Sequence, residues 1–452
     1  MPDFLTYRLA LILPRPRALL VASIDGVFVL PQISISRWER VAQQLTRSIQ
    51  ENWGLGAILL DVVDEDCPDT PCAVVEVRNS LLSYSASLAA VDLDEINGQA
   101  LKLTEREVIR SLLNGRNIGR GPFSRIGWLE DVQDWIRQCV TDQATYFDEN
   151  VRQLNASGSF ALVRFPMHAG PAYWLKATGT PNIHELYITV CLAQISPSFL
   201  PPLLGVRTEW NAWITQEAGY PLDDVPTLSN FKTAVRSLAE LQMETLNCTD
   251  MLTRAGALDH CVPVLRSRVD QVMNYLMAVM PRQTSTRAPR LEEHRLRQLG
   301  IILRDAFDRL EALEIPDTLI HNDLNPGNIL LDGCRCRFTD WAEAYVGNPF
   351  LSLQLFLVIA EKRAPNHEGE FWRKQLSEAY CDMWSKLLNG SQIARACSLI
   401  PLLSVYSCLH GRGDWFGSER SKTPPFEAYA RCLARHMDRA AQSPEFLGAL
   451  CR

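Results

Sequence analysis

The sequence predicts an α+β protein in which a small β-rich part precedes a large helical part. Three short apolar runs between residues 151 and 178 are separated by loops rich in Gly, Ser and Pro, which is typical of antiparallel hairpins. From Leu228 onward apolar residues recur at helical spacing, apart from one hairpin near residue 333. The 452 residues, 47% of them hydrophobic and 21% charged, suffice for two or three packed units.

Residues 1–120 are expected to form a separate small α+β domain. Its expected elements are strands at Leu9–Leu13, Ala18–Ile24 and Val27–Leu30, a helix from Ser36 to Glu51, and a strand at Ala57–Val63. Asp25-Gly26 lies between the second and third strands and is a strong hairpin signal. The helix is predicted from the spacing of Trp38, Val41, Leu45 and Ile49.

A helical connector is expected over residues 121–148. Between Gly127 and Val140, one apolar stripe holds Trp128, Val132, Trp135, Ile136 and Cys139, which favours an amphipathic helix packed between domains. A β-rich domain over residues 149–227 then precedes a helical domain over 228–452.

The β-rich domain is predicted from its three apolar runs and the helix after them. The strands are expected at Val151–Asn155, Phe160–Phe165 and Ala172–Thr178. Thr180-Pro181 is a good helix start, and the apolar spacing continues through Ile183, Leu186, Val190 and Cys191.

Charge and cysteine content limit the partners of the chain. Lys plus Arg number 45 against 52 Asp plus Glu, giving a net charge of −7, so the chain lacks the positive field that a nucleic acid requires. The thirteen cysteines show no framework spacing, which suits a reducing compartment. The first twenty residues have apolar runs broken by Arg8, Pro14 and Arg15, so we expect no membrane span and a cytoplasmic location.

The most informative stretch runs from Leu319 to Ala344. Asp323 is followed after four residues by Asn328, then by an apolar strand, an Asp-Gly turn and a return strand that ends at Asp340. The order matches a kinase catalytic loop and metal-binding loop, in which one Asp accepts the proton of the substrate hydroxyl while the Asn and the second Asp bind magnesium on ATP. Acids and amides that merely cap turns are the alternative explanation, but it accounts poorly for the full order and spacing.

This stretch resembles the aminoglycoside phosphotransferase and choline-kinase branch of the protein-kinase-like fold. The Asn-Pro-Gly-Asn run and the Asp-Trp in place of Asp-Phe-Gly are typical of that branch. The resemblance spans roughly residues 149 to 440 and implies a bilobal fold, a small β-rich lobe and a large helical lobe, with the active site between them. It implies ATP and Mg²⁺ as cofactors, Asp323 as the catalytic residue, Asn328 and Asp340 as metal ligands, and His321 as a support of the loop.

The resemblance also implies an upstream nucleotide clamp. Lys176 ends a predicted strand and is placed like the lysine that contacts the phosphates, and Glu185 on the next helix is placed like its ion-pair partner. The loop of Ser157, Gly158 and Ser159 is placed to cover the phosphates, although one glycine is a weak signal. Gln216 and Glu217 end the segment whose main-chain groups are expected to bind the adenine. This segment gives no base specificity, so ATP is assumed by default over GTP.

The region from Ile33 to Leu55 resembles a degenerate Nudix box. Glu39, Arg47, Glu51 and Gly54 fall in register, among others, but Ser48 and Asn52 replace two of the carboxylates that bind magnesium on a diphosphate. We therefore expect that hydrolase activity is lost. An ordinary amphipathic helix capped by Gly54 explains the pattern equally well.

Three functions are compared. The favoured one is an ATP- and magnesium-dependent phosphotransferase that acts on a hydroxyl of a neutral or cationic small molecule. The competing one is a non-catalytic, pseudokinase-type nucleotide-sensing scaffold, although no expected metal ligand or lysine is missing. A protein kinase is disfavoured because Asp-Trp-Ala-Glu replaces Asp-Phe-Gly and no Ala-Pro-Glu follows. The acceptor and the oligomeric state stay open.

Overall fold

The computed structural model describes residues 3–450 except 64–68, 79–86, 99, 116–119, 141–146, 148, 149, 366 and 412. Residue 149, the predicted start of the β-rich domain, and parts of the connector therefore lie outside the described residues. The chain divides into two compact units. The first comprises Met1–Leu186 and Pro202–Glu217, and the second Tyr187–Pro201 and Ala218–Arg452. The predicted α+β class, with β-rich and helical parts, is confirmed.

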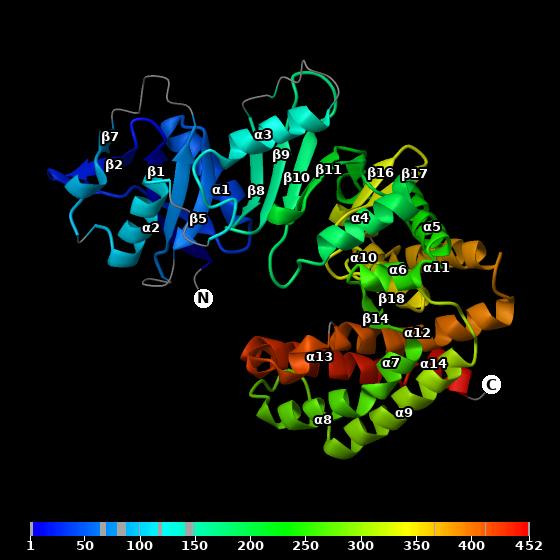
Figure 1. Ribbon diagram of the computed structural model, residues 1–452. Helices are drawn as coiled ribbons and strands as arrows, with labels where there is room; N and C mark the ends of the chain where they lie inside the picture. Colours follow the sequence, from blue (N-terminus) through cyan, green and yellow to red (C-terminus); the bar gives the residue numbers. More distant parts are fainter. Residues whose placement is uncertain are drawn as a thin grey trace. The chain divides into compact units, whose positions relative to one another are not determined.

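The first unit begins with a seven-stranded mixed sheet (Figure 1). Its strands are β1 (Phe4–Leu13), β2 (Ala18–Ile24), β3 (Val27–Val29), β4 (Gln32–Ser36), β5 (Ala57–Val63), β6 (Cys72–Val77) and β7 (Leu88–Val91). β1 pairs antiparallel with β2 and β4 and parallel with β6. Asp25 and Gly26 join β2 to β3 with φ of 51° and 81°, which confirms the predicted hairpin.

The first helix starts later than predicted. Helix α1 spans Val41–Trp53, whereas the sequence predicted a start at Ser36. Residues 32–36 instead form β4, because their backbone pairs with the start of β1. Trp38, predicted on the buried stripe, is 81% exposed, while Leu45 and Ile49 are fully buried. The Nudix-like character of this domain stays a prediction. Turn η1 (Leu93–Glu95) and helix α2 (Leu103–Leu113) follow.

A five-stranded antiparallel sheet completes the first unit. Its order is β11-β12-β10-β9-β8. The strands are β8 (Arg152–Ala156), β9 (Ala161–Phe165), β10 (Tyr173–Ala177), β11 (Leu203–Arg207) and β12 (Ala212–Gln216), with turn η3 (Thr208–Trp210) between the last two. The three strands predicted after residue 150 are thus confirmed to within a residue at each end.

One hydrophobic core joins the two sheets of the first unit. Helix α3 (Trp128–Cys139) contributes Trp128 and Trp135 to a cluster that also holds Ala10 of β1 and Val163 of β9. The predicted helix is confirmed, and it packs against residues of both sheets. The buried side chain of Gln153 adds a polar link, because it accepts from the Leu59 N–H at 2.8 Å and donates to the Leu59 carbonyl at 2.9 Å.

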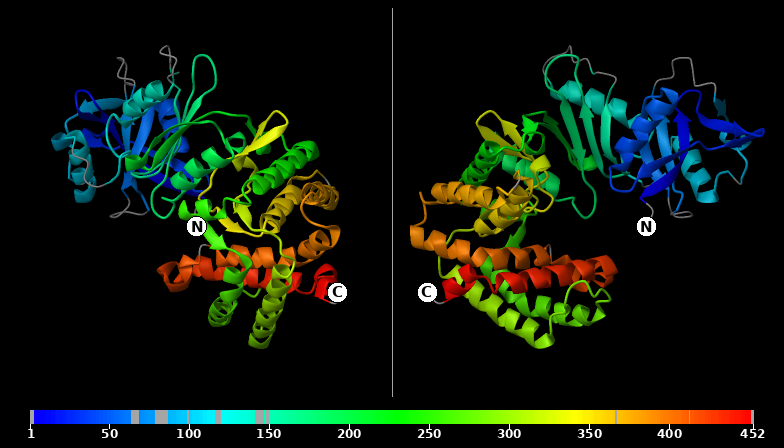
Figure 2. Two further views of the ribbon diagram at one scale, coloured as in Figure 1. Left: turned by 45° about the vertical axis from the view of Figure 1, so that its right-hand side comes forward. Right: turned by 180° about the vertical axis from the view of Figure 1, so that it is seen from behind.

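Helices dominate the second unit (Figure 2). They are α5 (Leu228–Glu244), α6 (Thr249–Arg254), α7 (Val262–Ser267), α8 (Val269–Val279), α9 (Glu293–Glu311), α10 (Phe350–Arg363), α11 (Gly369–Trp384), α12 (Gly390–His410), α13 (Pro424–Ala440) and α14 (Pro444–Leu450). Short 3₁₀ turns are η2 (Pro197–Phe199), η4 (Leu222–Asp224), η5 (Met280–Arg282), η6 (Pro326–Asn328), η7 (Asp414–Gly417) and η8 (Glu419–Lys422).

Two three-stranded sheets lie among these helices. One contains the predicted hairpin of β16 (Ile329–Asp332) and β17 (Arg335–Phe338), to which β13 (Tyr220–Pro221) adds. The other, which the sequence did not predict, is made of β14 (Leu258–His260), β18 (Tyr345–Gly347) and β15 (Thr318–Ile320). These strands have three residues each, too short to leave a recognisable period in the sequence.

Helix α4 (Glu185–Ile195), which runs from the first unit into the second, also starts later than predicted. The chain at Thr180-Pro181 forms a turn, in which the Asn182 N–H donates to the Gly179 carbonyl at 2.7 Å. Ile183, predicted on the apolar stripe, is 46% exposed, whereas Leu186 is buried.

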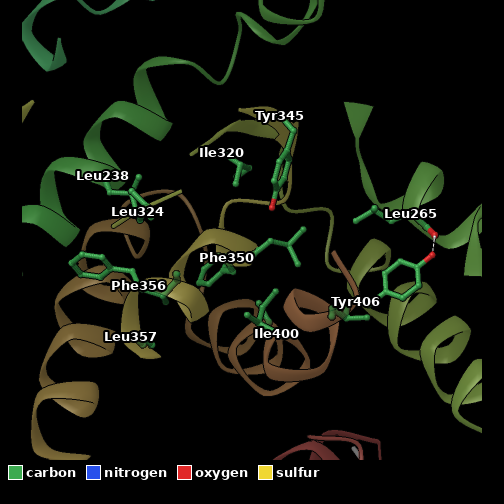
Figure 3. Close-up of a cluster of buried hydrophobic side chains, with 14 of the residues drawn as sticks. Leu238, Leu265, Ile320, Leu324, Tyr345, Phe350, Phe356, Leu357, Ile400 and Tyr406 are labelled. Atoms are coloured by element: carbon green, nitrogen blue, oxygen red, sulfur yellow. Dashed lines mark hydrogen bonds between the residues drawn. The ribbon is translucent and has the colours of Figure 1, made fainter. Parts of the chain in front are cut away.

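The core of the second unit surrounds β15, β18 and α10. In Figure 3, Ile320 and Tyr345 of the two strands lie above Phe350 and Ile400, and the Tyr406 hydroxyl donates to the Leu265 carbonyl at 2.9 Å. Helix α12 has the length and apolar composition of a membrane span, but much of it is buried in this core, as in a core helix of a globular protein.

Candidate functional site

Asp323 lies in the loop between β15 and η6 with its carboxylate fixed by two amides. The side-chain nitrogen of Asn328 donates to Asp323 Oδ2 and to the Asp323 carbonyl, both at 3.0 Å. The side-chain nitrogen of Asn325 donates to Asp323 Oδ1. Both carboxylate oxygens are therefore oriented by neutral donors, and each keeps a lone pair that can accept a proton or a further hydrogen bond.

His321 connects this loop to the segment before Asp340. Its Nδ1 accepts the Asp323 N–H at 3.2 Å, and its Nε2 lies 2.8 Å from the Thr339 carbonyl. These partners fit a single neutral tautomer with the proton on Nε2. The ring is 2% exposed and packs 4.5 Å from the Trp341 ring. The predicted supporting role of His321 agrees with this geometry.

The hairpin of β16 and β17 returns the chain from Asn328 to Asp340. Ile329 pairs with Phe338, and the Thr339 N–H donates to the Asn328 carbonyl at 3.0 Å. Asp340 follows with a φ of 69°, a left-handed conformation that Asp tolerates better than most residues. The predicted metal ligands are thus brought to the same end of the hairpin.

The donor set suits a hard divalent cation. Because the Asn328 amide nitrogen is engaged by Asp323, its side-chain oxygen is the atom that can serve as a ligand, and the Asp340 carboxylate is the second predicted ligand. Magnesium is usually bound through one or two such oxygens together with substrate phosphates rather than by an all-protein cage. The part of the chain that the structure describes has no cluster of three His, Cys, Asp or Glu side chains able to hold a metal.

Lys176 and Glu185 form the predicted ion pair in the first unit. Lys176 Nζ donates to Glu185 Oε1 at 2.5 Å, and the two side chains are 15% and 1% exposed. Lys176 faces the ring of Trp213 across the β10–β12 pair, with its nitrogen 5.8 Å from the ring centroid. A carboxylate buried to this extent requires a charged partner, so the pair is more than two solvated surface charges.

The turn of Ser157, Gly158 and Ser159 is held against the connector. The Phe123 N–H donates to the Gly158 carbonyl at 3.1 Å, and a Cβ at Gly158 would lie 1.4 Å from the Arg120 carbonyl oxygen. The Ser157 hydroxyl accepts the Phe160 N–H at 3.1 Å. Close backbone packing thus accounts for the glycine, and contact of this turn with phosphates stays a prediction.

Gln216 ends β12 and Glu217 follows it, and the N–H groups of both are already bonded. The Gln216 N–H donates to the Pro202 carbonyl at 2.9 Å, and the Glu217 N–H donates to the Ala172 carbonyl at 2.8 Å. An adenine edge therefore needs other main-chain groups as donors. The Glu217 carboxylate accepts two bonds from Arg164, at 2.6 and 2.8 Å, which lower its pKa.

Two contributors to the site were not predicted. Asn325, quoted in the motif but given no role, donates to Asp323, and its position two residues after an acid is the available signal. Gly219, with a φ of 66°, lies against β16, where a Cβ would be 2.1 Å from the Leu331 carbonyl oxygen. This contact joins segments about 110 residues apart, and no local pattern encodes it.

Comparison with known proteins agrees with the motif. Residues 234–388, which include Asp323, Asn328 and Asp340, match the model of a phosphotransferase enzyme family. No curated protein sequence matches the chain.

Solved structures similar to this chain include three enzymes of low identity. A macrolide 2'-phosphotransferase from Brachybacterium faecium is 16% identical, with 68% of this chain and 98% of that chain covered and a TM-score of 0.39. An aminoglycoside phosphotransferase from Alicyclobacillus acidocaldarius is 14% identical, with 69% and 96% covered and a TM-score of 0.42. A choline kinase from Cryptosporidium parvum is 12% identical, with 71% and 98% covered and a TM-score of 0.48.

Proposed function

We propose that this chain is an ATP- and Mg²⁺-dependent phosphotransferase that moves the γ-phosphate to a hydroxyl of a small molecule. The proposal rests on one observation. Asn328 donates a hydrogen bond to Asp323 and lies at the same end of a hairpin as Asp340, within a segment that matches a phosphotransferase family. Phosphoryl transfer depends mainly on positioning and charge stabilisation, which fixed oxygen groups of this kind supply.

Asp323 acts on the acceptor. The acceptor oxygen attacks the γ-phosphorus, its proton passes to an Asp323 carboxylate oxygen, and the bond between the γ-phosphorus and the β–γ bridging oxygen breaks to release ADP. The donors from Asn325 and Asn328 keep the carboxylate pointed in one direction during this step.

The remaining residues orient the nucleotide. Asn328 and Asp340 hold the magnesium, which when bound neutralises charge on the phosphate oxygens. Lys176, fixed by Glu185, contacts the phosphates. The acceptor is a small molecule, neutral or cationic in keeping with the net charge of −7.

The test is an ATP-consumption screen of the full chain against a library of hydroxylated metabolites and antibiotics. Asp323→Asn should leave the magnesium- and ATP-dependent rise in melting temperature nearly intact and lower kcat at least about a thousandfold. Asp250→Asn, an exposed acid on α6, is the matched control and should keep wild-type kcat.

Two outcomes count against the proposal. Full activity of Asp323→Asn on the acceptor found in the screen contradicts the role of Asp323. A magnesium-dependent thermal shift with ATP, but no turnover with any alcohol, favours the nucleotide-sensing scaffold instead.

A further inference from the structure

Two cysteines in the second unit lie side by side on consecutive helices. Cys381 is in the last turns of α11 and Cys397 is in the second turn of α12. Their Sγ atoms are 3.6 Å apart, and both residues are half-buried, so a small reagent can approach them. A disulfide brings the two sulfurs to about 2 Å, so forming the bond requires the two side chains to move closer together than they lie here.

The two thiols are chemically unequal. The hydrogen bond from the Cys397 thiol is the largest effect that lowers the pKa of Cys381, and Ser377 one turn earlier adds to it against the opposing effect of burial. The same hydrogen bond and burial raise the pKa of Cys397. Cys381 therefore ionises more readily than Cys397 and is the expected nucleophile of the pair.

Cys336, Cys408 and Cys432 differ from this pair. Cys336 is buried, and burial raises its pKa to about 12. Cys408 is half-buried, and burial raises its pKa to about 11. Such thiols behave as small hydrophobic side chains. Cys432 is exposed on α13, with its sulfur 3.8 Å from His436 rather than from a second thiol.

We propose that Cys381 and Cys397 form a reversible disulfide that links α11 to α12 under oxidising conditions. The oxidant is a small-molecule disulfide. The Cys381 thiolate attacks one of its sulfurs, forms a mixed disulfide and releases one thiolate. The Cys397 thiol then loses its proton and attacks the Cys381 sulfur, which releases the second thiolate and leaves one bond between the two helices.

The neighbourhood indicates that this bond can form without disturbing the core. Tyr380, beside Cys381, is fully buried, and its hydroxyl donates to Gln242 Oε1 at 2.6 Å and to the Pro349 carbonyl at 2.9 Å. On α12, Ala396 beside Cys397 is also fully buried. The helix backbones are thus anchored on their buried faces while the two sulfurs lie at the half-buried edge. Closing a loop of about sixteen residues should raise the stability of the oxidised form.

The experiment treats the reduced full-length protein with oxidised glutathione, blocks free thiols, and maps the disulfides by peptide mass spectrometry. The wild type should yield a cross-linked peptide pair containing Cys381 and Cys397, whereas exposed Cys432 should carry glutathione. Melting temperature should rise by at least about 3 °C on oxidation and return on reduction with dithiothreitol.

Single variants test the order of the steps. Cys397→Ser should trap glutathione on Cys381 and lose the thermal shift, and Cys381→Ser should leave Cys397 largely unmodified. Cys432→Ser is the matched control and should keep both the cross-link and the thermal shift. If wild-type Cys381 stays free or keeps glutathione while Cys432 is modified, the proposal is overturned. Because the readouts are mass and stability, the result is independent of phosphotransferase activity.

Discussion

His321→Leu tests whether the catalytic loop depends on the bond between its two halves. Leucine keeps an apolar side chain against Trp341 but cannot accept the Asp323 N–H or donate to the Thr339 carbonyl. Each lost hydrogen bond removes about 1 kcal/mol, and the buried groups left unpaired add a similar cost. We therefore expect the free energy of unfolding to fall by about 2 to 4 kcal/mol.

The effect on activity follows from the same two bonds. They fix the distance between the segment that carries Asp323 and the segment that leads to Asp340, and a misplacement of about 1 Å in such a site costs roughly a hundredfold in rate. The variant should thus lose about a hundredfold in kcat for the acceptor found in the screen, with stability measured by urea denaturation at a temperature where it stays folded.

The control is His294→Ala, an exposed histidine on α9 that should change neither quantity. A loss of stability without loss of kcat in His321→Leu would mean that the ring only fills space between the loop and Trp341. A kcat within twofold of wild type and unchanged stability would refute both parts of the reasoning.

Three further changes probe the first unit. Lys176→Met leaves the Glu185 carboxylate buried without its cation, so it should destabilise the protein by about 3 kcal/mol, and Lys176→Met with Glu185→Gln should recover part of this in urea denaturation. Gly158→Ala should destabilise by at least about 2 kcal/mol, because its Cβ would overlap the Arg120 carbonyl oxygen, and the melting temperature should fall. Glu76→Gln should stabilise the protein at pH 8 and flatten the pH dependence of its melting temperature.

The sign of the Glu76 prediction follows from burial. Burial raises the pKa of this carboxyl from 4.5 to about 7, although a hydrogen bond from the Gly127 N–H opposes the rise. The folded protein therefore binds the proton more tightly than the unfolded chain, and Glu76 makes stability fall as pH rises from about 4.5 through about 7. Glutamine cannot ionise and can still accept the Gly127 N–H.

Controls accompany each of these changes. A melting profile between pH 5 and 8 that is identical in wild type and Glu76→Gln would contradict the burial argument. Additive losses in the Lys176 and Glu185 double-mutant cycle would show that the two charges are not coupled. Gly98→Ala is the matched glycine control for Gly158, since neither glycine has a positive φ and a Cβ at Gly98 meets nothing within 4 Å.

Sequence reasoning succeeded where the determinants are close together in the chain. The hairpin between Asn328 and Asp340 was predicted from twelve residues of sequence, and the pairing of β16 with β17 confirms that it places both at one end. It was wrong where a distant partner decides the conformation. Helix α1 starts later than predicted because Ser36 pairs with β1 and residues 37 and 38 form a turn, and the periodicity of Trp38 carries no information about that pairing.

The joint between the two sheets of the first unit is a further non-local feature, and it bears on the proposed function. Three consecutive residues of β5 contact segments that come later in the chain. The Leu59 N–H donates to the Gln153 side chain, and the Leu60 carbonyl accepts from the Ser124 hydroxyl. Asp61 forms an ion pair with Arg120 at 2.6 Å. The connector residues next to these contacts also hold the turn at Gly158.

Because the hydrophobic core is shared as well, the seven-stranded sheet is part of the structure that positions the strand of Lys176. The seven-stranded sheet therefore has a structural role that does not depend on hydrolase activity. Substitutions on the inner face of β5 are then expected to disturb the proposed nucleotide clamp even though they lie about a hundred residues away in the sequence.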